Sequence, residues 1–271
     1  MRIEEPQSFE DFFNIYGKYY SNGDNYYRGQ AYLSWDIIPS IARNRNIKDI
    51  DFFLAVEKKL IEKFQQYIKY NKLEDLIPKV NAHQDSWVIL MVAQHCGLPT
   101  RLLDFSNDKI IALLFAVADL QYLNKDGALI IYENPTDKQK DLSIFRNDFV
   151  NHLDKSFFIQ APILMNKENN ELRLSEIKKF LQGSKFLCRD TQNLFNCLSE
   201  DQEHTNNLIK IKIPKKLKLD IIKEIIKKGE MVYDLFSGKN ELDHYGAILK
   251  NEFCKLNKSK INEYLKSENF Q

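Results

Sequence analysis

The sequence predicts an α+β fold in which helices pack around a mixed or antiparallel central sheet. Segments with the three- and four-residue apolar repeat of a helix alternate along the chain with short segments of strand-like composition. The chain has 271 residues, 44% of them hydrophobic, which is enough to bury a full core. Because no internal repeat and no flexible linker divides the sequence, we expect one domain over residues 1–271.

Helices and one strand are expected in the N-terminal part. Ser8, with Asp11 three residues later, resembles a capping box and predicts a short helix that ends before "SNGDN". The aromatic stretch "YYRGQAYLSWDIIPS" has few strong helix formers and indicates a strand with a turn after it. From residue 51 to 70, apolar residues recur at three- and four-residue spacing, which predicts an amphipathic helix.

Two more helices are predicted on either side of "GLPTRLLDFS". The first runs from about residue 85 to 96 and ends at a Gly with a Pro shortly after it, a common helix-end signal. The second extends from residue 108 to about 120 and is apolar nearly all round, so we expect it at the centre of the fold. Ser106 or Asn107 is its expected N-cap.

The second half of the chain is less regular in pattern. The apolar run "GALIIYENP" at 127–135 is typical of a buried strand, whereas residues 136–207 predict irregular structure with one or two short helices or strands. In "LIKIKI" at 208–213, apolar residues alternate with lysines, as in a strand with one solvated face. An amphipathic helix is predicted over residues 217–228.

Charge and cysteine usage narrow the class of protein. Lys plus Arg (39) almost cancels Asp plus Glu (38), so no global field attracts nucleic acid or anionic lipid. The four cysteines form no CxxC pair, which fits a reducing compartment, and a cytoplasmic location is expected. The N-terminus lacks the pattern of a signal peptide, and the longest apolar run, 110–118, is too short to span a bilayer, so no membrane partner is expected.

Several chemical signatures are absent from the sequence. It contains no GxGxxG, GxxxxGK[ST], HExxH or GxSxG motif, which removes support for Rossmann, P-loop, zincin and α/β-hydrolase chemistry. The five histidines have no metal-ligand spacing, so no metal site is expected. Cys96 next to His95 is interpreted as a small buried residue, because adjacent helix residues do not face each other.

Polar residues gather in "QHCGLPTRLLDFS". Free N–H groups at the start of the following helix attract anions, and Arg101 is suited to clamp a phosphate or carboxylate there. In the structural alternative, Arg101 pairs with Asp104, Thr100 caps a turn, and His95 bonds the carbonyls that end its helix. The residues by themselves leave the two alternatives open.

These residues carry a family resemblance. "YYRGQ" at 26–30, followed by "QHCGLPTRLLDFSNDKIIALLFAV" at 94–117, resembles the FRG domain, which has a Phe-Arg-Gly near its start and a QHxGxPTRLLDWT-like block. The resemblance extends weakly over a core of about residues 10–245 and implies a shared pocket. The implied catalytic candidates are Arg28, His95, Arg101 and Asp104, and the implied ligand-binding residues are Tyr27, Gln30, Gln94, Thr100 and Ser106.

The order of these parts also looks, more remotely, like that of ADP-ribosyltransferases. This resemblance implies NAD as cofactor, with Arg28 holding a phosphate or ribose and Ser106 or Thr100 placing the nicotinamide ribose. The carboxylate that such a site needs follows from no motif; Glu133 and Glu176 are the candidates. An NAD-using effector of a bacterial toxin or phage-defence system is one expected function.

Two other functions stay open. The same residues suit a non-catalytic module that binds a nucleotide or another anionic small molecule and signals to a protein partner. The lysine-rich stretch 210–228 suits nucleic-acid contact, although an edge strand guarded by lysines together with a solvated helix face explains it equally well.

Overall fold

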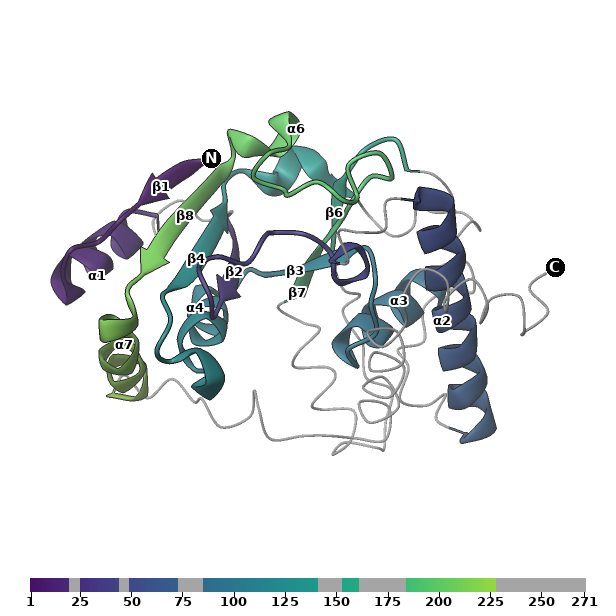
Figure 1. Ribbon diagram of the computed structural model, residues 1–271, viewed down its shortest axis with the longest axis horizontal. Coiled ribbons are helices and arrows are strands. Elements are labelled where there is room, and N and C mark those ends of the chain that lie inside the picture. Colours follow the sequence, from purple (N-terminus) through teal and green to yellow (C-terminus); the bar gives the residue numbers. More distant parts are fainter. Residues whose placement is uncertain (20–24, 44–48, 73–84, 141–152, 161–183, 228–271) are drawn as a thin grey trace.

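The computed structural model describes residues 1–19, 25–43, 49–72, 85–140, 153–160 and 184–227 (Figure 1). Its centre is one eight-stranded sheet in the order β1-β8-β4-β2-β3-β7-β6-β5. The strands are β1 (Arg2–Glu4), β2 (Tyr26–Gln30), β3 (Leu102–Ser106), β4 (Gly127–Tyr132), β5 (Gln139–Lys140), β6 (Phe157–Gln160), β7 (Ser184–Cys188) and β8 (Leu208–Ile213). The β1–β8 and β5–β6 pairs are parallel and the others antiparallel, so the predicted α+β fold with a mixed sheet is confirmed.

The predicted helices all lie in the described part of the chain. The α-helices are α1 (Phe9–Lys18), α2 (Ile50–Tyr70), α3 (Asp85–His95), α4 (Lys109–Val117), α6 (Gln202–Thr205) and α7 (Lys215–Lys227), and the 3-10 turns are η1 (Ser40–Ala42), η3 (Leu120–Tyr122) and η4 (Pro135–Lys138). Ser8 caps α1 by accepting a hydrogen bond from the Asp11 N–H at 3.1 Å, as predicted. Within the described residues, no helix has the length and apolar character needed to cross a membrane.

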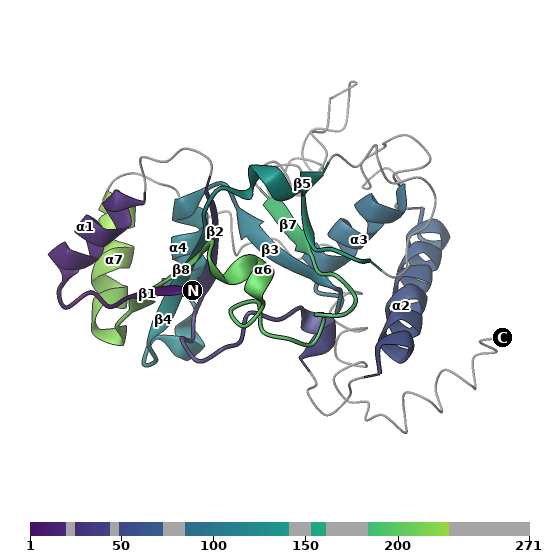
Figure 2. The ribbon, with the colours of Figure 1, turned by 90° about the horizontal axis from the view of Figure 1, so that it is seen from above.

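Helices cover one face of the sheet in two groups (Figures 1 and 2). The first group, α1, α4 and α7, packs on β2, β4 and β8 through a buried aliphatic and aromatic cluster. The second group, α2 and α3, lies at the other end of the sheet, over β3, β6 and β7. The opposite face is covered by residues 37–38 and 197–198, which pack on aromatic side chains of β2, β3, β4 and β6. We call these the helix face and the loop face.

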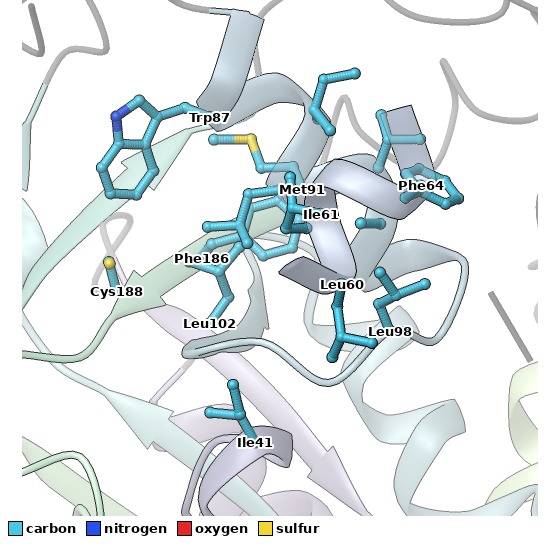
Figure 3. Packing of buried hydrophobic residues seen from close by; sticks show 14 of the residues in the cluster. Ile41, Leu60, Ile61, Phe64, Trp87, Met91, Leu98, Leu102, Phe186 and Cys188 are labelled. Atoms are coloured by element: carbon cyan, nitrogen blue, oxygen red, sulfur yellow. The ribbon is translucent and has the colours of Figure 1, made fainter. Parts of the chain in front are cut away.

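Figure 3 shows how the second helix group meets the sheet. Leu60, Ile61 and Phe64 of α2 and Trp87 and Met91 of α3 belong to one buried cluster with side chains from β3 and β7. Ile61 and Met91 lie beside Phe186 of β7 (Figure 3). Those strand residues, Leu102, Phe186 and Cys188, alternate with residues of the loop face, as the two-residue period of a strand requires. This packing fixes α3, and with it the end of the helix at His95, against β3.

Three expectations about element boundaries were wrong. "LLDFS" at 102–106 is a strand and not the lead into a helix, because five of its residues pair with β7. The N-cap of α4 is Asp108, whose Oδ1 accepts from the N–H groups of Ile110 and Ile111, and the helix ends at Val117. Residues 136–207 are more regular than expected, since they contribute β5, β6, β7 and α6.

The lysine-rich stretch has a different structure from the one expected. β8 lies between β1 and β4, so its lysines do not guard a sheet edge. Lys210 donates to the Leu33 carbonyl at 2.8 Å, and the fully buried Lys218 donates to the carbonyls of Ala31 and Tyr122 at 2.7 and 2.8 Å. Two of the lysines therefore hold η3 and the segment after β2 in place. Nucleic-acid binding by this stretch stays a prediction.

Candidate functional site

The two strands that carry most of the predicted site residues separate from each other. β2 pairs with β4 over five residues, and β3 pairs with β7 over five residues. Between β2 and β3, however, only Tyr27 and Ser106 pair. The edge of β3 that faces β2 is therefore mostly unpaired, and its backbone groups need other partners.

Side chains supply those partners. Nη1 of Arg28 donates to the Asp104 carbonyl at 2.7 Å, and Nε2 of Gln94 donates to the Leu102 carbonyl at 3.4 Å. The Leu102 N–H donates to the hydroxyl of Thr100 at 3.2 Å. Arg28, Gln94 and Thr100 thus satisfy the edge of β3 that β2 leaves open.

Gln94 links the end of α3 to this edge of β3, because both the NH₂ group and the oxygen of its side-chain amide form hydrogen bonds there. Besides the Leu102 carbonyl, its Nε2 donates to Oδ2 of Asp104 at 2.9 Å, while its Oε1 accepts from the hydroxyl of Thr100. Thr100 is itself held by Ser40 of η1, whose hydroxyl accepts from the Thr100 N–H at 3.0 Å. The structure therefore links four predicted residues, Arg28, Gln94, Thr100 and Asp104, into one chain of hydrogen bonds.

The ion pair of Arg28 and Asp104 lies at the end of this chain of hydrogen bonds. Nη1 of Arg28 lies 3.9 Å from Oδ2 of Asp104, and the Arg28 side chain is 13% exposed while that of Asp104 is 46% exposed. Burial lowers the pKa of Arg28, the Asp104 charge raises it, and the positive charge of Arg43 lowers it. Arg43 is exposed at the end of η1. The chain therefore ends in an ion pair whose carboxylate is open to solvent, and the positive charge of Arg43 acts on Arg28 from the end of η1.

Arg101 lies in a different environment. Its Nε and Nη2 each lie 2.7 Å from Oε2 of Glu57, and its backbone N–H donates to Oε1 of the same carboxylate at 2.8 Å. Both side chains are buried, at 3% and 1% exposed. Burial lowers the pKa of Arg101, but the attraction of Glu57 outweighs it and the pKa is raised. The expected Arg101–Asp104 pair is therefore wrong, and the guanidinium lies in the core and not at the start of α4.

The remaining predicted residues are spread around the chain of hydrogen bonds. Tyr27 lies on the helix face and its hydroxyl donates to the Tyr19 carbonyl at 3.3 Å. Gln30 donates to the Asp36 carbonyl at 3.5 Å, the hydroxyl of Ser106 accepts from the Asp108 N–H at 2.9 Å, and His95 is the half-buried last residue of α3. The hydrogen bonds of Tyr27, Gln30 and Ser106 are thus to nearby backbone groups, and a role of these residues or of His95 in ligand binding stays a prediction.

Of the two carboxylates proposed from the sequence, the one that the structure describes does not join this site. Glu133 forms an ion pair and a hydrogen bond with Arg2, near the N-terminus of the chain. Glu176 lies outside the described residues. In the described ranges, no group of three or more His, Cys, Asp or Glu side chains is placed to hold a metal ion.

Sequence reasoning missed three residues that act on predicted site residues: Ser40, which holds Thr100, Arg43, whose charge acts on Arg28, and Glu57, the buried partner of Arg101. Glu57 carried a signal, because it falls among Phe53, Leu60 and Ile61 in the apolar stripe of α2. A glutamate at such a position is buried and needs a positive partner. Nothing in the local pattern marks Ser40 or Arg43.

A second buried polar network, which no sequence pattern indicates, lies beside β4. Nδ1 of His204 lies 2.8 Å from the Tyr132 hydroxyl, and its Nε2 lies 3.9 Å from Oδ2 of Asp201. Asp201 accepts from Nη1 of Arg189 at 2.8 Å, and both Arg189 and His204 are fully buried. This network ties α6 to the sheet and has no opening to solvent through these two side chains.

The network makes the stability of the protein dependent on pH. Burial first, and then the charges of Lys138 and Arg189, lower the pKa of His204 to about 4. The pKa of a histidine in an unfolded chain is ~6.5, so the unfolded chain binds the proton first as the pH falls. The free energy of unfolding therefore decreases as the pH drops from ~6.5 towards 4. The loss is expected to be on the order of 3 kcal/mol. Urea unfolding between pH 7.5 and 4.5 measures it, and an unchanged slope in His204→Asn would contradict this assignment.

Comparison with known proteins agrees with the motifs on these strands. Residues 23–125, less than half of the chain, match the model of the FRG domain family. This range begins just before β2 and ends after η3, so it includes the hydrogen-bonded chain from Arg28 to Thr100. No curated protein and no solved structure matches the chain. The protein therefore contains an FRG domain, carried by residues 23–125.

Proposed function

We propose that the open edge of β3 binds a nucleotide or a similar anionic small molecule. The observation that supports this proposal is the pair of Arg28 and the half-exposed Asp104 at the end of the hydrogen-bonded chain, with the exposed Arg43 near enough for its charge to act on Arg28. A purely structural cap of the strand edge would need neither an exposed carboxylate nor a second arginine. Charged groups that are fixed by neighbours and open to solvent are typical of binding sites.

The two signs of charge fit the two parts of a nucleotide. A phosphate oxygen is a natural partner for the exposed Arg43, and for the guanidinium of Arg28, whose side chain is 13% exposed. Asp104 uses Oδ2 for Gln94 and keeps acceptor capacity for a ribose hydroxyl, as carboxylates do in other nucleotide sites. NAD carries both groups and is the first ligand to test.

A thermal-shift experiment tests binding. NAD, ADP-ribose and AMP are expected to raise the Tm of the wild-type protein by mass action, and Arg43→Gln is expected to weaken the apparent affinity about tenfold, the effect of ~1.4 kcal/mol. Arg43 is exposed, so the substitution leaves the fold intact. Arg2→Gln is the matched control, because Arg2 is another exposed arginine, paired with Glu133. Equal ligand shifts in both variants would contradict the proposal.

Turnover of NAD is the second candidate function, in the manner of an ADP-ribosyltransferase or NAD glycohydrolase acting as a toxin or phage-defence effector. Asp104 supports it, because this carboxylate lies beside Arg28, where the resemblance to ADP-ribosyltransferases needs a negative charge to stabilise an oxocarbenium-like transition state. The three described cysteines are free, as expected in the cytoplasm, where NAD is available.

Release of nicotinamide distinguishes the enzyme from the binding module. Wild-type protein incubated with NAD and a cell extract is expected to release nicotinamide. Asp104→Asn retains an acceptor oxygen for the ribose hydroxyl but loses the negative charge, so it is expected to keep an NAD-induced shift in Tm and to lose the activity by a factor of about 100 or more, the effect typical of one lost transition-state contact. Absence of release from the wild type, with the Tm shift present, would leave the binding function and remove the enzymatic one.

A further inference from the structure

Lys185 of β7 is a buried lysine that no acidic residue neutralises. The residue is 6% exposed, and no described Asp or Glu side chain lies within ion-pair distance of it. Its Nζ donates to Oε1 of Gln160 at 2.5 Å and lies 5.4 Å from the centre of the Tyr26 ring. Burial lowers the pKa of Lys185, and no neighbouring charge opposes this effect. A buried charge without a partner is costly, and proteins keep such groups mostly where they function.

The neighbours of Lys185 offer donors and few acceptors. A lysine ammonium only donates, so the Gln160 oxygen must face it, which directs the Gln160 NH₂ group away from Lys185 as a donor. Gln139 of β5 is arranged similarly, because its Oε1 accepts from the Tyr26 hydroxyl at 3.2 Å. The ammonium itself has three N–H groups, of which Gln160 takes one. Unused donors around a positive charge form a place for an anion.

Lys185, Gln160 and Gln139 come from three adjacent strands, β7, β6 and β5. Lys185 pairs in register with Gln160 of β6 and Phe105 of β3, so these side chains share the loop face. Gln160 is half-buried and Gln139 is exposed, which gives a small molecule access from solvent. These three residues lie beyond β3 in the sheet order and outside the range that matches the FRG family.

We propose that Lys185, Gln160 and Gln139 form a binding site for a small carboxylate, separate from the Arg28–Asp104 site. One positive charge matches the single negative charge of a carboxylate, and the amide NH₂ groups of Gln160 and Gln139 are donors that its oxygens can accept. The apolar loop face below, with Phe105 and Phe158, lowers the local dielectric and strengthens the ion pair. The site is independent of the proposed function, because it shares no residue with it.

The test measures Tm in sodium acetate, sodium phosphate and sodium chloride at equal ionic strength. Acetate is expected to raise the Tm of the wild-type protein above its value in chloride by about 2–4 °C. Lys185→Met is expected to abolish this shift and to raise the Tm in chloride, because it removes an unpaired buried charge. Lys140→Met is the matched control, since the neighbouring Lys140 contacts the Phe157 ring, which lies on the opposite face of the sheet.

A second variant keeps the proposal testable if Lys185→Met does not fold. Gln160→Glu places a carboxylate beside Lys185 within the chain, so it is expected to raise the Tm in chloride and to remove the response to acetate. An equal acetate shift in wild type and in either variant would overturn the proposal, as would a folded Lys185→Met protein with a lower Tm in chloride. A shift with phosphate but not with acetate would overturn the assignment to a carboxylate.

Discussion

Substitution of Gly29 by alanine is expected to destabilise the protein strongly. A Cβ atom at this position would lie 1.9 Å from the Ala112 carbonyl oxygen, 2.7 Å from the Ala116 N–H nitrogen and 2.9 Å from Cβ of Phe115. The first two are backbone atoms of α4, so no side-chain rotation relieves the overlap, and the helix must move off β2. Overpacking of a core costs about 1–3 kcal/mol, and we expect a loss above this range.

Urea unfolding of Gly29→Ala measures this loss, and Gly17→Ala provides the control. Gly17 lies in α1 with no atom within 4 Å of its added Cβ, so alanine is expected to stabilise the protein there by about 0.5–1 kcal/mol through helix propensity. The same change is thus expected to have opposite signs at the two sites. A Gly29→Ala protein as stable as the wild type would show that α4 is not seated on β2 as described.

The close contact between Gly29 and α4 explains the glycine of the "YRG" motif at 27–29 by packing alone. Tyr27 and Gly29 face α4, whereas Arg28 between them lies on the other side of the strand and reaches Asp104. The glycine lets the helix approach, and the approach places β2 where Arg28 can reach the edge of β3. The motif therefore combines a structural residue with a candidate functional one.

The sequence could predict the elements whose signals are local. The apolar repeat of α2, the helix-end signal at Gly97 with its positive φ of 89°, and the alternation in β8 are all confirmed. β3 was missed because its pairing with β7 joins residues about eighty positions apart, and five residues containing Asp104 and Ser106 look like a polar loop on their own. The partner of Arg101 was missed for the same reason, since Glu57 lies 44 residues away.

The candidate site could be predicted only through the family resemblance. It grouped Arg28 with Gln94, Thr100 and Asp104, and the structure places these four in one chain of hydrogen bonds. It also grouped Arg101 with them, although the guanidinium of Arg101 faces the core. Recurrence of a residue in a motif does not separate ligand contact from support of the fold, because both require a fixed side chain at a fixed place.

Substitution of Glu57 by glutamine is expected to be the most damaging change at a charged residue. It keeps an oxygen for the Arg101 N–H but leaves the Arg101 guanidinium buried without a negative partner. Removing one member of a buried ion pair costs about 3–5 kcal/mol, because the remaining charge has lost both water and its partner. The free energy of unfolding in urea measures the effect.

The double variant Glu57→Gln, Arg101→Met separates support of the fold from ligand binding. It removes both charges and retains the backbone acceptor, so it is expected to recover most of the stability lost in Glu57→Gln, since apolar groups often replace a buried ion pair without loss. If Arg101 only supports the loop that carries Thr100, the folded double variant keeps the NAD-induced shift in Tm. Loss of that shift in a protein of wild-type stability would contradict this interpretation and make Arg101 a ligand-binding residue, as the motif by itself implies.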